Sequence, residues 1–241
     1  SGPLRVLPFA ALHDGEDYLV RRHTISYLSS LDALRRPVAE AAATGPVTAF
    51  GWAGTREHPL SFTVREAEAL GHTFADATVV QGQQATRARF VGEAARARLL
   101  HVATHAEFRP EAPLQSALEL SDGELPLLRV LGLELSASLV VLSACDTGLG
   151  SLDGADGVVG LQQAFLAAGA RRVLASLWRV SDLGAALLMK HVFRALRAGQ
   201  PPARALRTAQ LELRKRFPHP AFWAGFRLDT QGPLAPRGAP Q

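Results

Sequence analysis

Short apolar runs recur along this chain, and a segment with the hydrophobic period of a helix follows most of them. Strands that are buried on both faces have this continuous apolar pattern, whereas half-exposed strands alternate apolar and polar residues. The runs are VTAF (47–50), ATVV (77–80), LLHVAT (99–104), LVVLSA (139–144), RVLASLW (172–178) and, as a sixth candidate, FWAGFRL (222–228). This alternation predicts an α/β protein whose mostly parallel sheet, of about six strands, is covered by helices on both faces.

The segments between these runs carry residues that start and stop helices. Thr86 is expected to cap a helix within QGQQATRARFVGEAARA, and Ser181 to cap a helix that stops at Gly199. A further helix is predicted over residues 157–168, where apolar residues recur on one face. The segment 106–138 has no clear period, and EAPLQSALELSDGELPLL within it is interpreted as a hairpin plus a short helix beside the functional site.

Composition limits the classes of protein that fit this sequence. With 241 residues, 47% of them apolar, the chain is long enough for one large α/β domain or two small ones. Its one cysteine excludes an internal disulfide and favours a reducing compartment, so we expect a cytoplasmic protein. Arg or Gly interrupts the longest apolar stretches before the ~18 residues that a membrane span needs, so we expect no membrane partner.

The charge pattern does not favour a nucleic-acid partner. The net charge is +4, but acidic residues are interspersed with the arginines, and aromatic residues do not interleave with them as a base-stacking surface requires. The densest basic run, ELRKRF, ends a predicted helix, where cations complement the helix dipole. Because the chain begins without Met and ends in the Pro/Gly-rich TQGPLAPRGAPQ, we expect a domain excised from a longer protein and a disordered tail over 230–241.

Two reactive side chains follow predicted strands. His105 comes after LLHVAT, and Cys145 comes after LVVLSA, 40 residues later. Because ligands bind at the carboxyl ends of strands in open α/β sheets, neighbouring strands would bring the two residues together at a site. An imidazole can convert the thiol into a nucleophilic thiolate, and the backbone N–H groups of Ala106 and Cys145 are candidate oxyanion-hole donors. A lone cysteine is more often a small buried residue and a strand-end histidine more often structural, so the residues alone leave both readings open.

Five motifs follow one another in the order of a known family: HVATHAEF, ALELSDGEL, LVVLSACDTGLG, GLQQAFLAAGARRVLASLWRVSD and HPAFWAGFRL. Together with LPFAALHDGEDYLVRRHTISYLSSLDAL, they resemble the CHAT peptidase domain, a bacterial branch of the caspase–separase superfamily, over residues 3–229. The resemblance implies a caspase-like three-layer sandwich and a cysteine endopeptidase with His105 as the catalytic histidine, Cys145 as the nucleophile and no metal or cofactor. It also implies a protein or peptide substrate and a regulatory helical-repeat region or partner protein.

The resemblance further implies the order of the chemical steps. Cys145 would attack the scissile carbonyl, His105 would protonate the leaving amine, and water would then hydrolyse the thioester. The family usually has Gly after the histidine, where this chain has Ala106. Because the donor required there is a backbone N–H, alanine serves if its φ is negative, whereas a left-handed conformation would place the oxyanion hole in doubt.

Enzymes of this superfamily select the residue before the cut in a pocket beside the nucleophile. Asp146, Trp178 and Asp182 are the candidate wall residues, and an inward-pointing carboxylate would favour a basic residue in the substrate. The alternative is that the two aspartates cap the turn and the helix that follow them. The flanking loop adds three residues, for which purely local turn chemistry is the alternative: Ser116, the candidate for substrate binding, with Ser121 and Asp122.

Rival functions fit the sequence less well. On a strand, His101 and His105 would lie about 13 Å apart at about 3.3 Å per residue, too far to chelate one zinc ion. GLGSLDG after a strand resembles a loosened phosphate loop, but Asp153 within it and Asp156 just after it would repel a pyrophosphate. No G-x-S-x-G of a serine hydrolase occurs. A catalytically silent interaction module on the same fold remains the alternative to the peptidase.

Overall fold

The computed structural model describes residues 7–28, 45–54, 63–107, 109, 111–143, 153–178 and 180–232. Within these ranges seven strands form one sheet in the order β1-β10-β9-β8-β4-β2-β3. Every neighbouring pair is parallel except β10 and β9, which are antiparallel. The strands are β1 (Tyr27–Leu28), β2 (Val47–Gly51), β3 (Ala77–Gln81), β4 (Leu99–Ala103), β8 (Leu139–Leu142), β9 (Arg172–Ser176) and β10 (Phe226–Thr230).

This sheet confirms the predicted mostly parallel α/β fold and adds one strand to it. The additional strand is β1, in which only two residues pair with the end of β10. No apolar run in the sequence predicts it. The sixth predicted strand starts later than expected, because 220–222 form the short 3-10 helix η6 (Pro220–Phe222) and β10 begins at Phe226. It also continues to Thr230, the first residue of the expected tail.

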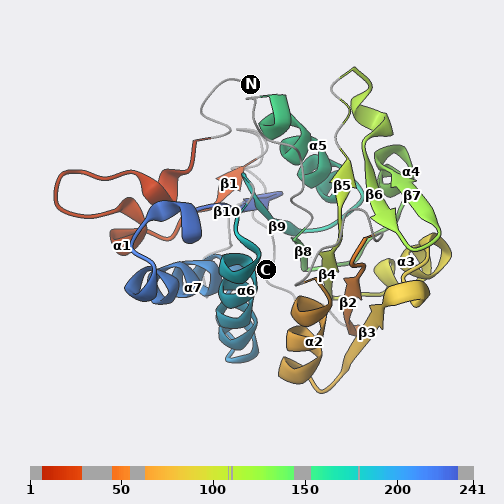
Figure 1. The fold of residues 1–241 in the computed structure, drawn as a ribbon, viewed down its shortest axis with the longest axis horizontal. Helices are drawn as coiled ribbons and strands as arrows, with labels where there is room; N and C mark the ends of the chain where they lie inside the picture. The colour runs from red at the N-terminus through yellow and green to blue at the C-terminus, as the bar shows by residue number, and fades with distance from the viewer. Residues whose placement is uncertain are drawn as a thin grey trace, which may run out of the picture.

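Helices cover both faces of the sheet, as Figure 1 shows. Alternate residues of the strands enter two separate cores: in β8, Leu139 and Val141 enter one and Val140 and Leu142 the other. One core includes residues of α2 (Thr63–Thr73), α6 (Asp182–Arg197) and α7 (Pro202–Arg216). The opposite core includes residues of α3 (Arg87–Ala94), α4 (Leu127–Leu131) and α5 (Asp153–Ala167). The three-layer arrangement expected from the resemblance is therefore present.

The predicted caps hold the helices where the sequence places them. The Thr86 Oγ1 accepts a hydrogen bond from Arg89 N at 3.3 Å, and Ser181 Oγ accepts one from Gly184 N at 3.2 Å. α6 ends at Arg197, and Gly199, with φ of +81°, turns the chain into α7. One boundary differs, since α5 begins at Asp153, before the predicted 157. α3 begins directly after its predicted cap Thr86, and residues 82–84 ahead of it form the 3-10 turn η4 (Gly82–Gln84).

The segment between β4 and β8 forms a small antiparallel sheet of its own. Its three strands lie side by side in the order β5 (Ala106–Glu107), β6 (Ala117–Leu120) and β7 (Gly123–Pro126). The 3-10 turn η5 (Pro113–Gln115) comes before β6 in the chain, and α4 follows β7. The predicted hairpin plus short helix is confirmed, and β5 is an addition to it. This small sheet begins directly after His105 and therefore lies next to the predicted catalytic histidine.

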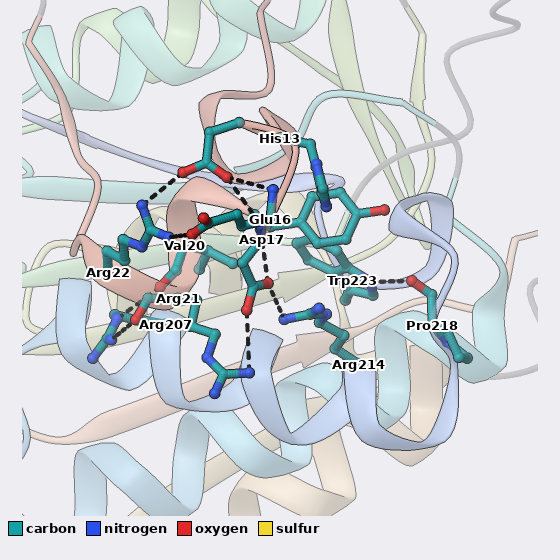
Figure 2. A network of polar contacts seen from close by, with 12 residues as sticks. His13, Glu16, Asp17, Val20, Arg21, Arg22, Arg207, Arg214, Pro218 and Trp223 are labelled. Carbon is teal, nitrogen blue, oxygen red and sulfur yellow. Dashed lines mark hydrogen bonds and ion pairs between the residues drawn. The ribbon is translucent and has the colours of Figure 1, made fainter.

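The N-terminal segment packs against α7. It contains the 3-10 turn η2 (Phe9–Ala11) and the one-turn helix α1 (Leu19–Arg22). Asp17 of this segment contacts Arg214 of α7 at 2.8 Å and Arg21 at 3.1 Å, as Figure 2 shows. The ring of Tyr18 meets Trp223 edge-on, with 5.0 Å between the ring centroids. These contacts fix α1 beside α7, on the same side of the sheet as α6.

Candidate active site

The carboxyl ends of β4 and β8 lie next to each other, as the cysteine–histidine hypothesis requires. The two strands are parallel and paired in register up to Val102 and Leu142. Beyond the last pair, the Ser143 backbone N–H donates to the Val102 carbonyl at 2.9 Å. His105 follows Val102 by three residues, and Cys145 follows Ser143 by two. Cys145 and Asp146 lie outside the described residues, so their approach to His105 stays a prediction.

The chain around His105 is held by the small sheet. His105 is buried, with 9% of its surface exposed. Its carbonyl accepts a hydrogen bond from Glu119 N at 2.9 Å, and the Thr104 hydroxyl donates to the Glu119 carbonyl. Because β6 contacts the Thr104 hydroxyl, the His105 carbonyl and the Ala106 backbone, the position of His105 is set by pairing with another strand and not by a free loop.

Ala106 has the conformation that the oxyanion-hole hypothesis needs. It lies in β5 opposite Leu118, and no residue other than glycine has a positive φ in the described chain. Since His105 and Glu119 form a hydrogen-bonded position of the antiparallel ladder, the next pair, Ala106 with Leu118, is a non-hydrogen-bonded one. The Ala106 N–H consequently points away from β6. Donation to an oxyanion remains a prediction.

Ser116 holds the loop that follows β5. Its hydroxyl accepts a hydrogen bond from Arg109 N at 3.0 Å, its carbonyl accepts one from Leu127 N at 2.8 Å, and only 4% of its surface is exposed. In this arrangement Ser116 contacts the protein backbone, and its predicted role in substrate binding stays untested.

Ser121 and Asp122 make contacts well beyond their own turn. The Ser121 hydroxyl donates to the Gln83 carbonyl at 3.0 Å, and Asp122 Oδ1 accepts from the Arg87 N–H at 2.8 Å. That backbone hydrogen bond, aided by the Arg87 guanidinium, lowers the pKa of Asp122. The β6–β7 turn is thereby attached to the start of α3.

Arg109 is a residue of the site region that sequence analysis missed. Its guanidinium contacts Glu107 of β5 at 2.9 Å and Glu124 of β7 at 2.8 Å, and it donates to the Gln115 carbonyl at 2.9 Å. These hydrogen bonds raise the pKa of Arg109 and lower that of Glu107. No local pattern in the sequence indicates this cluster, because it depends on which strands of the small sheet become neighbours.

Trp178 and Asp182 follow β9, the strand beside β8. Trp178 is half-buried, and its Nε1 donates to the Ala221 carbonyl at 3.3 Å. A side chain at Gly225 would meet the Trp178 ring at 3.0 Å, so this glycine allows the ring to lie close to the backbone. Asp182 is the first residue of α6, and the helix cap is Ser181. The structure does not describe the Asp182 side chain, so its place in a specificity pocket is untested.

Two further polar groups at this edge of the sheet were missed. Trp52 directly follows β2, and its backbone N donates to Ala103 at 3.0 Å; Ser143 follows β8. Trp52 Nε1 and Ser143 Oγ are buried and have no hydrogen-bond partner within the described chain. Their positions immediately after predicted strands could have indicated that they lie at the edge of the sheet that carries the site.

The histidine of the zinc alternative lies away from this edge. His101 is fully buried within β4, which confirms that HVATH begins as a strand. Its Nε2 is 3.5 Å from Glu66 Oε2 of α2, and its ring meets Phe193 of α6 edge-on. Within the described ranges no three His, Cys, Asp or Glu side chains gather as metal ligands. In the same ranges no helix has the length and hydropathy that a bilayer-spanning segment needs.

Known structures share this fold. The separase–securin complex of Saccharomyces cerevisiae matches with a TM-score of 0.59 and 12% identity, over 95% of this chain and 14% of that one. The Arg-specific cysteine proteinase gingipain R matches with a TM-score of 0.51 and 10% identity, over 85% of this chain and 50% of that one. At these identities the similarity establishes the caspase-like fold, which is that of these cysteine peptidases.

Relatives among named proteins cover part of the chain. Tetratricopeptide repeat protein 28 of Mus musculus is 41% identical over 104 residues, and its Homo sapiens counterpart 40% identical over 101 residues. Each match covers 41% of this chain and 4% of the relative, so the chain spans a small fraction of these proteins. Both relatives are mammalian and give no support to the expected bacterial origin. A family model described as the CHAT domain matches residues 1–231, and the chain therefore belongs to the CHAT domain family.

Proposed function

We propose that this domain is a cysteine endopeptidase in which Cys145 is the nucleophile and His105 the general base and acid. The observation that carries the proposal is the in-register parallel pairing of β4 with β8, continued by the hydrogen bond from Ser143 to Val102. It brings the chain to the same edge of the sheet three residues before His105 and two residues before Cys145. The caspase-like fold and the similarity to a cysteine proteinase support the same reaction class.

In the proposed reaction, His105 removes the thiol proton and Cys145 Sγ attacks the scissile carbonyl. The Ala106 and Cys145 backbone N–H groups stabilise the oxyanion, which collapses when the C–N bond breaks and His105 protonates the leaving amine. Water, deprotonated by His105, then hydrolyses the thioester and regenerates the thiol. The burial of His105 and the hydrogen bond that its carbonyl accepts from Glu119 N support this role, because a general base must be held in one place.

We propose a basic residue before the cleaved bond. Asp146 directly follows the proposed nucleophile, Asp182 begins α6 after β9, and Trp178 supplies a half-buried aromatic surface after the same strand. A carboxylate at the base of the pocket would bind a guanidinium or ammonium group. Gingipain R, which has the same fold, is described as Arg-specific. In a longer protein, a helical-repeat region is the proposed regulator, in keeping with relatives named for tetratricopeptide repeats.

An electrophilic peptide probe with arginine at the reactive position tests the dyad. Cys145→Ala removes labelling, and His105→Gln lowers the labelling rate by about 100-fold or more, because general-base catalysis contributes about 10²–10⁴. His72→Ala, which changes an exposed histidine at the end of α2, is the matched control and leaves the rate unchanged. Circular dichroism of each variant shows whether it is folded.

Equal labelling of wild type and His105→Gln would contradict the dyad. It would favour the second candidate, a silent interaction module, which draws support from relatives named for their repeats and not for a peptidase. A peptide-library cleavage profile of wild type against Cys145→Ala then measures the preferred residue before the cut. A profile without enrichment of Arg or Lys would overturn the proposed basic specificity alone.

A further inference from the structure

A concave pocket lies between the N-terminal segment and the turn that joins α6 to α7. The pocket has a volume of about 530 Å³, within the range of small-molecule sites. Its side chains are rich in hydrogen-bond donors, and no carboxylate is among the residues that line it. The polar lining residues are Arg22, Thr24, Gln200, Arg204, Arg207 and Thr208.

The positive charge of this pocket is only partly balanced. Arg22 contacts Asp14 at 2.7 Å and Glu16 at 2.9 Å, and neither carboxylate lines the pocket. Arg207 donates to the backbone carbonyls of Val20 and Arg21, which carry no full negative charge (Figure 2). Arg204 is exposed and has no ion pair or side-chain hydrogen bond within the described chain. Among the residues that the structure describes, the guanidinium groups of Arg204 and Arg207 are therefore left without a carboxylate.

The backbone at this place adds to the positive potential. α7 starts at the pocket with Pro201 as its N-cap, which offers no side-chain acceptor, and Pro202 as its first residue. The positive end of the dipole of a 15-residue helix lies beside Arg204 for this reason. The Thr208 hydroxyl donates to Gln200 Oε1 at 2.9 Å, which orients the Gln200 amide and leaves its NH₂ group as a donor.

This pocket is distant from the proposed active site. α6 begins after β9, at the carboxyl edge of the sheet, and its last residue, Arg197, precedes the pocket turn. Sixteen helical residues span about 24 Å at 1.5 Å per residue. The pocket thus lies at the opposite end of α6 from the strand ends that lead to His105 and Cys145.

We propose that this pocket binds the phosphate groups of a small phosphorylated molecule, of the size of a nucleoside diphosphate. Guanidinium forks match phosphate oxygens in geometry and charge, and the remaining lining donors suit the other oxygens. The charges come from separate segments and converge on one concavity, whereas an acidic peptide requires a basic stripe along the surface. Because Arg22 belongs to the N-terminal segment and Arg204 to α7, the ligand would connect the two and stabilise their docking.

Titration calorimetry with ADP and with inorganic pyrophosphate, at low salt, tests the proposal. Both probes bind the wild-type chain, and Arg204→Ala weakens each by about tenfold or more, since hydrogen bonds to charged groups are among the strong ones. Arg204→Lys retains part of the affinity. Arg96→Ala, which removes an exposed arginine at the end of α3, keeps wild-type affinity. ADP also raises the Tm of wild type more than that of Arg204→Ala.

Three results would overturn the proposal. The first is no binding of either probe at millimolar concentration, and the second is an equal loss of affinity in Arg204→Ala and Arg96→Ala, which would indicate general charge attraction. The third is equal or tighter binding of an oligoglutamate peptide, which would assign the pocket to acidic segments of proteins. None of these readouts depends on peptidase activity, so the proposal stands or falls separately from the dyad.

Discussion

Two buried polar pairs in this molecule differ in how well their hydrogen bonds are formed. At the β1 edge of the sheet, the Arg227 guanidinium binds both carboxylate oxygens of Asp229, with Nε to Oδ2 at 2.7 Å, and its Cζ lies 3.9 Å from the centre of the Tyr27 ring. In the centre of the sheet, His101 Nε2 and Glu66 Oε2 are 3.5 Å apart. Neither His101 nitrogen nor that Glu66 oxygen has a hydrogen-bond partner among the described residues.

The difference concerns what burial requires of a polar group. A charged pair compensates for lost hydration only when its hydrogen bonds are well formed, and a buried atom without a partner destabilises the fold. The Arg227–Asp229 pair meets this condition, and the Arg227 guanidinium also packs on the ring of Tyr27 in β1, which pairs with β10. The His101–Glu66 pair does not meet it and lies between α2, β4 and α6 in an otherwise apolar layer.

The largest effect is expected for Asp229→Ala. It leaves the buried Arg227 guanidinium without its carboxylate, which costs about 3–5 kcal/mol of unfolding free energy. Urea denaturation measures the change. Asp76→Ala, which breaks the ion pair between an exposed carboxylate and Arg98, is the matched control and is expected to cost far less. Equal losses in the two variants would show that burial does not decide the strength of these pairs.

A smaller effect, with a distinctive pattern, is expected for the central pair. His101→Leu alone leaves a buried glutamate beside an apolar side chain and destabilises by about 1–3 kcal/mol. The double variant His101→Leu/Glu66→Met restores an apolar layer of similar volume and is about as stable as wild type, or more stable. Denaturation of the two single variants and the double variant gives the coupling energy. A double variant less stable than both single ones would mean that the two side chains stabilise the fold independently, and would overturn the view that the pair weakens this layer.

Sequence patterns predicted the sheet but not these pairs. The main strands follow from continuous apolar runs, and Thr86 and Ser181 mark their helices correctly, because such signals are local. β1 and β5 have two residues each and owe their existence to partners far along the chain. The sequence also predicted that His105 lies at the carboxyl edge of the sheet, because it directly follows an apolar run that forms a strand. Arg109 and the contacts of Ser116 were not, because they depend on which strands become neighbours.

The smallest effect is expected where a carboxylate has good partners but remains near the surface. Asp17 joins the N-terminal segment to α7 through Arg214, and it also pairs with Arg21 of its own segment. The hydrogen bond from the Tyr18 backbone N–H is the largest cause that lowers the pKa of Asp17 below 3.8, and the two arginines add to it. Because the folded-state pKa is lowered, the stabilisation is complete above pH 3.8 and is lost as pH falls through the lower, folded-state value. Asp17→Asn therefore lowers Tm by a few degrees at neutral pH, and its difference from wild type shrinks in acid. A difference in Tm that stays constant down to pH 2 would show that Asp17 acts through the geometry of its turn and not through its charge. The N-terminal contact and the buried Arg227–Asp229 pair would then differ in whether charge stabilises them, and not only in how deeply they are buried.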